Sequence, residues 1–226
     1  MCANTPSPPA GHGLRYSRAT LRRPWVGAVL LAAAGSAAAY TTTLTAAAPQ
    51  EIYLQVGVGT FTKDYTLGGK PKANATINTV STTLASAVVG NGTAQAMTTN
   101  SAAAQSFYDG RTFCTVPAQL YIGGFFRTTG AATAPAQVTA TVPAALLDAT
   151  GDSISFSQIK WTSSGIGDGA AEPFPAGTFA NGTVQTVGSM ASNTWNESCW
   201  TFSYLNTNVA PVGTYTGAVL YTMSAP

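Results

Sequence analysis

Two carboxylates, Asp109 and Glu197, are the residues of this chain best suited to acid–base chemistry. Glycoside hydrolysis needs two carboxyl groups about 5–10 Å apart, one acting as the acid and the other as the base or nucleophile. Each of the two lies shortly before a cysteine, Cys114 or Cys199, so a disulfide would bring them into one neighbourhood. The alternative interpretation is that Asp109 is a turn residue before Gly110 and that Glu197 is a solvated charge at a strand end.

Aromatic side chains offer a second kind of site, a platform for a sugar, since amphipathic rings supply a large contact area at low entropic cost. Trp195 lies in the polar stretch Asn-Thr-Trp-Asn-Glu and is the strongest candidate for exposure, with Tyr204 as a second binding residue. Trp200 is adjacent to Cys199, and a tryptophan beside a disulfide between sheets is ordinarily a core residue. We therefore expect Trp195 and Tyr204, but not Trp200, to be available for binding.

Most catalytic and cofactor motifs are missing from the sequence. The only histidine, His12, lies in a leader that we expect to be removed, which excludes Ser-His-Asp catalysis and zinc sites with histidine ligands. No phosphate-binding or dinucleotide-binding glycine motif occurs. Ser157 and Lys160 have the SxxK spacing, but they lie in an expected strand, where positions three apart face opposite sides. Four acids in Gly-rich loops could offer oxygens to calcium, without the EF-hand spacing: Asp148, Asp152, Asp168 and Glu172. We expect no enzyme activity, no cofactor and no metal.

The first 39 residues have the organisation of a secretory signal peptide. Four arginines between Arg15 and Arg23 precede the apolar run Trp25–Ala34, and Ala37–Ala39 supplies the small residues of a cleavage site. The run is shorter than the roughly 20 residues that cross a bilayer, so no transmembrane segment is expected. Cleavage after Ala39 would leave one domain, residues 40–226, with six cations and eight acids. We expect export to the periplasm, cell surface or extracellular space, and no nucleic-acid partner, because the cations are few and scattered.

Two cysteines remain after the leader, and in an exported chain they are expected to form one disulfide, Cys114–Cys199. That bridge would close a loop of 85 positions across the second half of the domain.

Alternation of apolar and polar residues predicts an all-β domain. The pattern is clear at Ile52–Val58 and Val138–Val142, and a change of phase between Phe156 and Ile159 predicts a β-bulge. The apolar run Ala118–Arg127 contains two glycines and suits a central strand bent in its middle. Residues 74–101 could form a short helix or strands, and their threonines favour strands. We expect a single antiparallel β-sandwich of about seven to ten strands, immunoglobulin-like or jelly-roll-like.

The C-terminal sequence Pro211–Pro226, a Pro-x-Gly-Thr-Tyr turn followed by an alternating strand, resembles the last strand of bacterial fimbrial and spore-coat-U-like subunits. Gly213 also lies fourteenth from the C-terminus, where chaperone–usher pilins carry a glycine. The resemblance implies an incomplete immunoglobulin-like sandwich whose open groove is capped by a periplasmic chaperone and then filled by a neighbour's N-terminal strand. Tyr40–Thr45 or Ile52–Val58 would be that donor strand.

The sequence therefore favours a secreted structural or surface-assembly subunit, of fimbrial type, that polymerises by β-strand addition through self-association or a chaperone and usher. The first alternative is a carbohydrate-binding or adhesive module that holds a glycan with exposed aromatics. A carboxylate-dependent hydrolase is the third. Charged residues make up only 8% of the chain, and threonine-rich strands with one disulfide suit a durable scaffold, whereas an enzyme more often shows a cluster of titratable groups.

Overall fold

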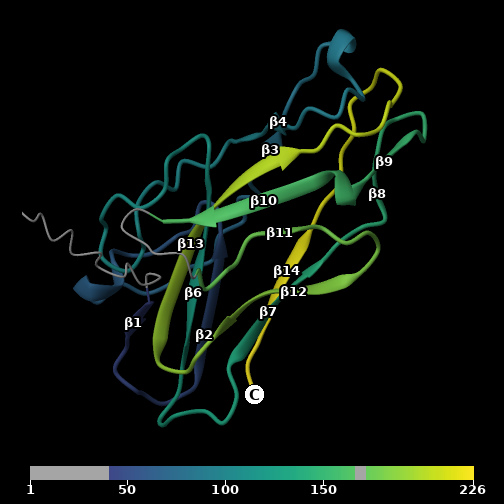
Figure 1. The fold of residues 1–226 in the computed structure, drawn as a ribbon. Helices are drawn as coiled ribbons and strands as arrows, with labels where there is room; N and C mark the ends of the chain where they lie inside the picture. The colour runs from purple at the N-terminus through teal and green to yellow at the C-terminus, as the bar shows by residue number, and fades with distance from the viewer. Residues whose placement is uncertain (1–40, 166–171) are drawn as a thin grey trace, which may run out of the picture. The chain divides into compact units, whose positions relative to one another are not determined.

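Strands dominate the structure of this chain, which we describe from a computed structural model at residues 41–165 and 172–226 (Figure 1). The expected leader, residues 1–39, and Asp168 lie outside these ranges. Within them, the only helical elements are three single-turn 3-10 helices: η1 Tyr65–Leu67, η2 Ser86–Val88 and η3 Phe156–Gln158. The strands are β1 Thr41–Thr43, β2 Glu51–Val56, β3 Val80–Ser81, β4 Gln95–Ala96, β5 Thr98–Thr99, β6 Leu120–Arg127, β7 Ala136–Thr141, β8 Ala145–Leu147, β9 Ser153–Ser155, β10 Ile159–Ser164, β11 Gly177–Thr178, β12 Val184–Met190, β13 Thr194–Tyr204 and β14 Leu220–Ser224.

The strands form several antiparallel sheets, which confirms the expected all-β class. The largest has seven strands, in the order β11-β10-β13-β6-β2, with β1 and β4 also paired to β13. A three-stranded sheet has the order β12-β7-β14, and two pairs complete the set, β3-β5 and β8-β9. Both segments predicted to donate a strand to a neighbour are paired inside this chain: β1 lies antiparallel to β13, and β2 lies antiparallel to β6.

Strand β13 is buried on both of its faces, which explains why it is the longest strand. Trp200 and Phe202 point into the main apolar core, which they share with Val138 of β7 and Met190 of β12, so the two larger sheets have a common interior. On the opposite face, Trp195 and Cys199 pack against smaller clusters contributed by the segment before β6. Because neighbouring side chains on a strand face opposite sides, one strand serves both interiors.

Strand β6 bears the two glycines of the apolar run, and one of them permits a close backbone approach. A Cβ on Gly124 would lie 2.0 Å from the carbonyl oxygen of Tyr53 on β2, so no larger residue fits without moving that strand. The sequence prediction of a central strand in Ala118–Arg127 is thus confirmed, since β6 lies between β13 and β2.

One local prediction is corrected by the structure and another is refined. The change of phase after Phe156 comes from the 3-10 turn η3, which ends β9 and begins β10, and not from a β-bulge. Residues 74–101 do contain the favoured strands, but only the two-residue strands β3, β4 and β5, with η2 and irregular segments between them. Threonine and asparagine side chains bond to nearby backbone there, as Asn78 does with Val58, and such bonds compete with regular ladders.

Candidate functional site

Strand β2 is one of the two outermost strands of the large sheet, with β11 at the opposite end, and one side of its backbone has no partner strand. The amide of Gly57, just after β2, donates to the carbonyl of Tyr121 at 2.7 Å, which sets the alternation of hydrogen bonds along the β2–β6 pair. Tyr53 and Gln55 therefore bond towards β6, while Ile52, Leu54 and Val56 direct their backbone groups away from the sheet. Among the described residues, none bonds to those outward groups.

A hollow of about 250 Å³ follows the same strand and is lined by all of its residues from Tyr53 to Val56. Its other wall is formed by residues 58–60 and by Lys72, Asn74 and Thr76. This wall is held in place by hydrogen bonds, because the amide of Lys72 donates to the carbonyl of Thr60 at 2.8 Å and Asn74 Nδ2 donates to the carbonyl of Val58 at 2.6 Å. The hollow is thus a built feature beside the free edge.

The side chains along this edge are apolar and only partly covered. Ile52 is 48% exposed, and Leu54 and Val56 are partly buried against the main core. Natural edge strands commonly carry lysine or proline, which discourages pairing with another chain, and β2 has neither. Its backbone and its side chains are both suited to pairing.

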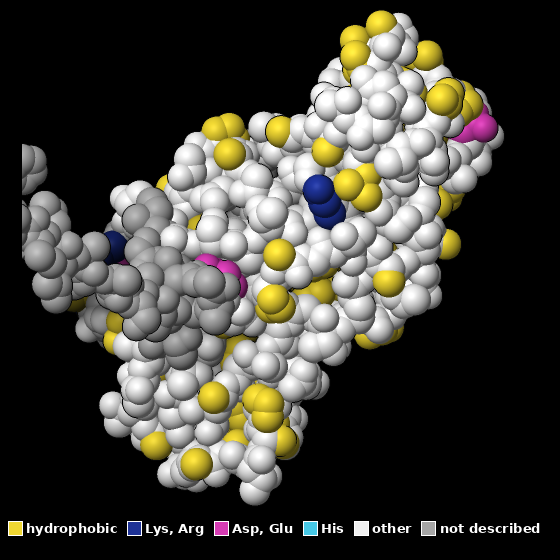
Figure 2. All heavy atoms as spheres, in the orientation of Figure 1, with side chains coloured by type: hydrophobic (Ala, Val, Ile, Leu, Met, Phe, Trp, Pro, Cys, Tyr) yellow, Lys and Arg dark blue, Asp and Glu magenta, His cyan; other side chains and the backbone are white. Residues whose placement is uncertain are grey.

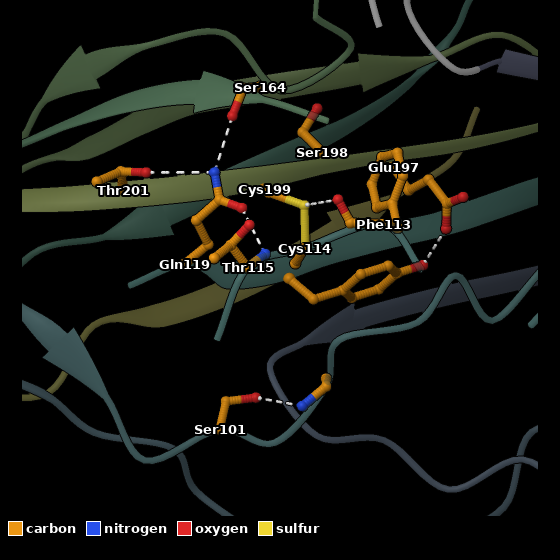
Figure 3. Close-up of a disulfide and its surroundings, with 12 residues drawn as sticks. Ser101, Phe113, Cys114, Thr115, Gln119, Ser164, Glu197, Ser198, Cys199 and Thr201 are labelled. Carbon is orange, nitrogen blue, oxygen red and sulfur yellow. Dashed lines mark hydrogen bonds between the residues drawn. A yellow bond between two sulfur atoms is a disulfide. The ribbon is translucent and has the colours of Figure 1, made fainter. Parts of the chain in front are cut away.

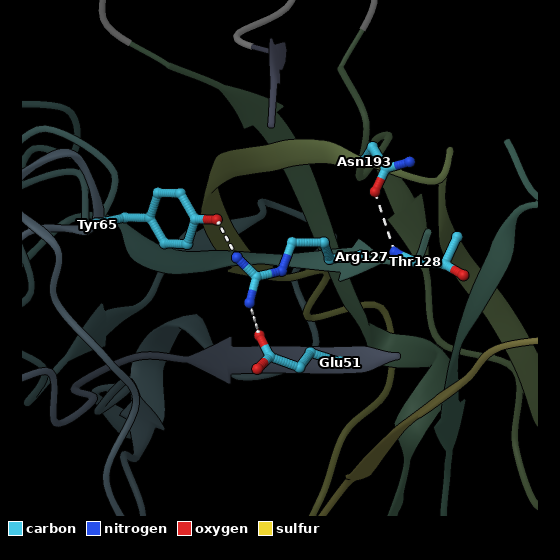
Figure 4. A network of polar contacts seen from close by, with 5 residues as sticks. All are labelled: Glu51, Tyr65, Arg127, Thr128 and Asn193. Atoms are coloured by element: carbon cyan, nitrogen blue, oxygen red, sulfur yellow. Dashed lines mark hydrogen bonds and ion pairs between the residues drawn. The ribbon is translucent and has the colours of Figure 1, made fainter. Parts of the chain in front are cut away.

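The one charge on β2, Glu51, is already neutralised by a partner in the same chain. Figure 4 shows the guanidinium group of Arg127, on β6, lying between the carboxylate of Glu51 and the hydroxyl of Tyr65. Arg127 Nη1 donates to Tyr65 Oη at 3.0 Å, and Nη2 pairs with Glu51 Oε2. An approaching strand would therefore meet a paired carboxylate.

A second free edge belongs to β14, the outermost strand of the three-stranded sheet. Leu220, at its start, is 65% exposed, while Tyr221 and Met223 pack on the main core. The two free edges approach each other near the C-terminus, where Gln50 Nε2 donates to the carbonyl of Pro226 at 3.4 Å.

The disulfide predicted from the sequence is confirmed, and it joins the segment before β6 to β13 (Figure 3). Cys114 and Cys199 are both buried, with Cα atoms 5.5 Å apart, as is usual for a disulfide. Gln119 supports the same junction: its Oε1 accepts from the amide of Thr115 at 2.7 Å, and its Nε2 donates to Ser164 Oγ at 2.9 Å.

The prediction that Trp195 and Tyr204 are exposed is wrong. Trp195 is 0% exposed and lies among rings that include Tyr65, Tyr108 and Phe125, with centroids 5.4, 5.8 and 5.6 Å away. Its polar sequence neighbours suggested a surface position, but residues 61–67 and 107–108 fold over it and cover the indole. Tyr204 is buried in the main core.

The aromatic residues that do reach the surface form the rim of this cluster, and the sequence reasoning missed them. They are partly buried, and they lie on β2 and on the two loops that cover the indole: Tyr53, Phe61, Tyr65, Phe107 and Tyr108. Tyr65 and Tyr108 are nearly parallel, with centroids 6.0 Å apart and an interplanar angle of 20°. No periodic pattern marks these residues, because they lie mostly in loops.

Glu197 is fully buried, so the interpretation of this residue as a solvated strand-end charge is wrong. Its Oε2 accepts hydrogen bonds from Tyr121 Oη at 2.6 Å and from Trp195 Nε1 at 3.0 Å. Burial raises the pKa of Glu197 above its ordinary value, and the negative charge of Asp109 acts in the same direction. A carboxyl group enclosed in this way cannot contact a substrate.

Neither a metal centre nor a membrane helix is found within residues 41–165 and 172–226. No three residues among their histidines, cysteines and acids gather where they could hold a metal ion. In the same ranges no helix has the length and apolar character needed to cross a membrane.

Comparison of the chain with protein-family models, with curated proteins and with solved structures finds no match in any of the three.

Proposed function

We propose that this chain is an exported β-sandwich subunit of a surface assembly, and that it joins its partner by β-strand addition along β2. The observation that carries the proposal is the free edge of β2, whose outward backbone groups border a hollow lined by the same residues. The proposal assigns the chain a scaffolding role without catalysis.

Strand addition draws its affinity from main-chain hydrogen bonds and its specificity from alternate side chains. Ile52, Leu54 and Val56 together offer about six outward donors and acceptors to an added strand. Their apolar side chains, only partly covered in the free subunit, would be buried further by the side chains of the added strand. In this proposal β2 accepts a strand, and the donor segment belongs to the partner.

The surface of the subunit fits an extracellular scaffold. Charged side chains are sparse on the face seen in Figure 2, and most of its atoms belong to backbone or to uncharged polar side chains. The buried disulfide Cys114–Cys199 links two segments far apart in the sequence, which suits a protein that stays folded outside the cell.

Binding of a neutral glycan is a second candidate function, favoured by the near-parallel pair Tyr65 and Tyr108 at the rim of the aromatic cluster. Its test is titration with neutral oligosaccharides monitored by tryptophan fluorescence. Binding should be lost in Tyr108→Ala and kept in Tyr215→Ala, which removes a tyrosine from another part of the surface.

The main proposal is tested by sedimentation of the full chain, expressed from residue 1 so that any leader processing takes place. The key variant is Ile52→Pro, because the amide of residue 52 points away from the sheet and its loss leaves the chain's own ladder intact. We expect the wild type to associate with increasing concentration and the variant to remain monomeric. Val212→Pro, at a 96% exposed position in the loop before β14, is the matched control and should associate like the wild type.

Hydrogen exchange supplies the second measurement. The amides of Ile52, Leu54 and Val56 should exchange rapidly in dilute protein and become protected on association. Rapid exchange of these amides in the associated protein would refute strand addition at β2.

A further inference from the structure

We infer that the strand added to β2 is the β2 strand of a second copy, in a two-fold antiparallel pair centred on Leu54; this inference rests on the proposed function. A two-fold interface uses the same surface twice, so a strand can serve it only when it complements itself in the antiparallel direction. The sequence Glu51–Val56 meets that condition in the positions of its outward backbone groups and in the apolar character of its side chains.

The register follows from the outward backbone groups. Only Ile52, Leu54 and Val56 can bond to an added strand, so an antiparallel copy must bring these residues opposite one another. With Leu54 opposite Leu54 of the second copy, Ile52 lies opposite Val56 on both sides. This register uses all three outward residues, whereas a copy centred on Tyr53 would use only two.

The side chains agree with this register. Ile52, Leu54 and Val56 lie on one face of β2, so apolar side chains would meet apolar side chains across the whole interface. Packing of Ile52 against Val56 of the second copy would bury the half of the Ile52 side chain that is now exposed to water.

The charges are complementary in the same arrangement. Glu51 of one copy would lie opposite Gly57 of the other. Gly57 precedes residues 58–60, which line the hollow together with Lys72. Lys72 has no carboxylate partner among the described residues, while Glu51 keeps one oxygen outside its contact with Arg127. No like charges are placed opposite each other, so the edge lacks the usual defence against self-pairing.

The free edge of β14 fits a partner strand less well. The amide of Val142 bonds towards β12, so every second residue of β7 bonds to β12 and the residues between them bond to β14. In the register of the β7–β14 pair, this leaves only Tyr221 and Met223 with backbone groups that point away from the sheet. One hollow at the surface runs along β2, and another lies on β12 around Gly188. The two-fold pair therefore uses β2 rather than β14, because β2 has the longer set of outward groups and a hollow beside it.

Cysteine cross-linking tests the register directly. The full chain with Cys2→Ser, which removes the leader cysteine, receives Leu54→Cys and is oxidised in air. Opposite Cα atoms in an antiparallel pair are about 4.5–5.5 Å apart, within disulfide range, so Leu54→Cys alone should give a covalent dimer. Ile52→Cys alone should give at least tenfold less dimer, and mixing it with Val56→Cys should restore the yield. Val212→Cys, at a 96% exposed position in the loop before β14, measures random cross-linking.

The failures of the inference and of the proposed function are distinguishable. Cross-linking of Leu54→Cys only to Met223→Cys on β14, with a ladder of larger oligomers, would overturn the two-fold pair and leave strand addition standing. A chain that stays monomeric at all concentrations, with Leu54→Cys no more cross-linked than Val212→Cys and with unprotected amides on β2, would overturn both.

Discussion

Removal of the disulfide should lower the free energy of unfolding by an amount that the structure allows us to estimate. Cys114 and Cys199 are 85 residues apart. For a closed loop of that length, the chain-entropy model gives about 4–5 kcal/mol, because the bridge restricts the unfolded chain. With a urea m-value of about 2 kcal/mol/M for a domain of this size, the unfolding midpoint should fall by about 2 M.

The assay is urea unfolding followed by the fluorescence of the buried Trp195 and Trp200, in the wild type and in the double variant Cys114→Ala/Cys199→Ala. The wild type reduced with dithiothreitol is the matched control, since it lacks the bridge but keeps both side chains. Both forms should lose a similar free energy, with a slightly larger loss in the variant from the missing sulfur atoms. A loss of less than about 0.5 M in the midpoint would refute the reasoning, because the closed loop would then contribute little.

Three further predictions concern buried positions. Burial raises the folded-state pKa of Glu197 above its ordinary 4.5, so the stabilisation by this residue is complete below pH 4.5 and is lost as the pH rises through the folded-state pKa. In urea titrations the stability of Glu197→Gln should therefore increase relative to that of the wild type between pH 4 and pH 8. A difference in stability that does not change with pH would contradict this. Gly124→Ala should cost about 1–3 kcal/mol in the same assay, since its Cβ would collide with Tyr53, whereas Gly130→Ala, with no atom near its Cβ, should stay within about 0.5 kcal/mol. Trp195→Ala should cost about 3–5 kcal/mol, and a loss below about 1 kcal/mol would show that the indole is not the centre of its cluster.

Local patterns in the sequence were sufficient for the class of fold and for the disulfide. Alternation marks strands such as Glu51–Val56 wherever one face is buried, and Cys114 and Cys199 are the two cysteines outside the leader. Strand order could not be read in the same way, because it depends on pairings between distant segments. The alternation at β2 identified a strand, but nothing local showed that it lies at the edge of a sheet.

The errors at the candidate site have the same origin. Polar neighbours suggested that Trp195 and Glu197 face water, yet polar groups there are bonded inside the protein: Asn196 Nδ2 donates to Thr194 Oγ1 at 2.9 Å, and Glu197 Oε2 accepts from Tyr121. Whether a polar residue is solvated or bonded in the interior depends on loops far away in the sequence. Here those loops are the segments that contain Phe61 and Tyr108.

The disulfide also has a mechanical consequence for a subunit that works under tension. If the chain is pulled from its two ends, the bridge carries the load directly from Cys114 to Cys199, and the 85-residue segment between them is shielded. A fully extended segment of that length would span about 290 Å, so this length is withheld from extension for as long as the bridge remains intact. Strands β7 and β12 lie wholly inside the shielded segment and would keep their pairing with each other while the flanking strands β2 and β14 give way first.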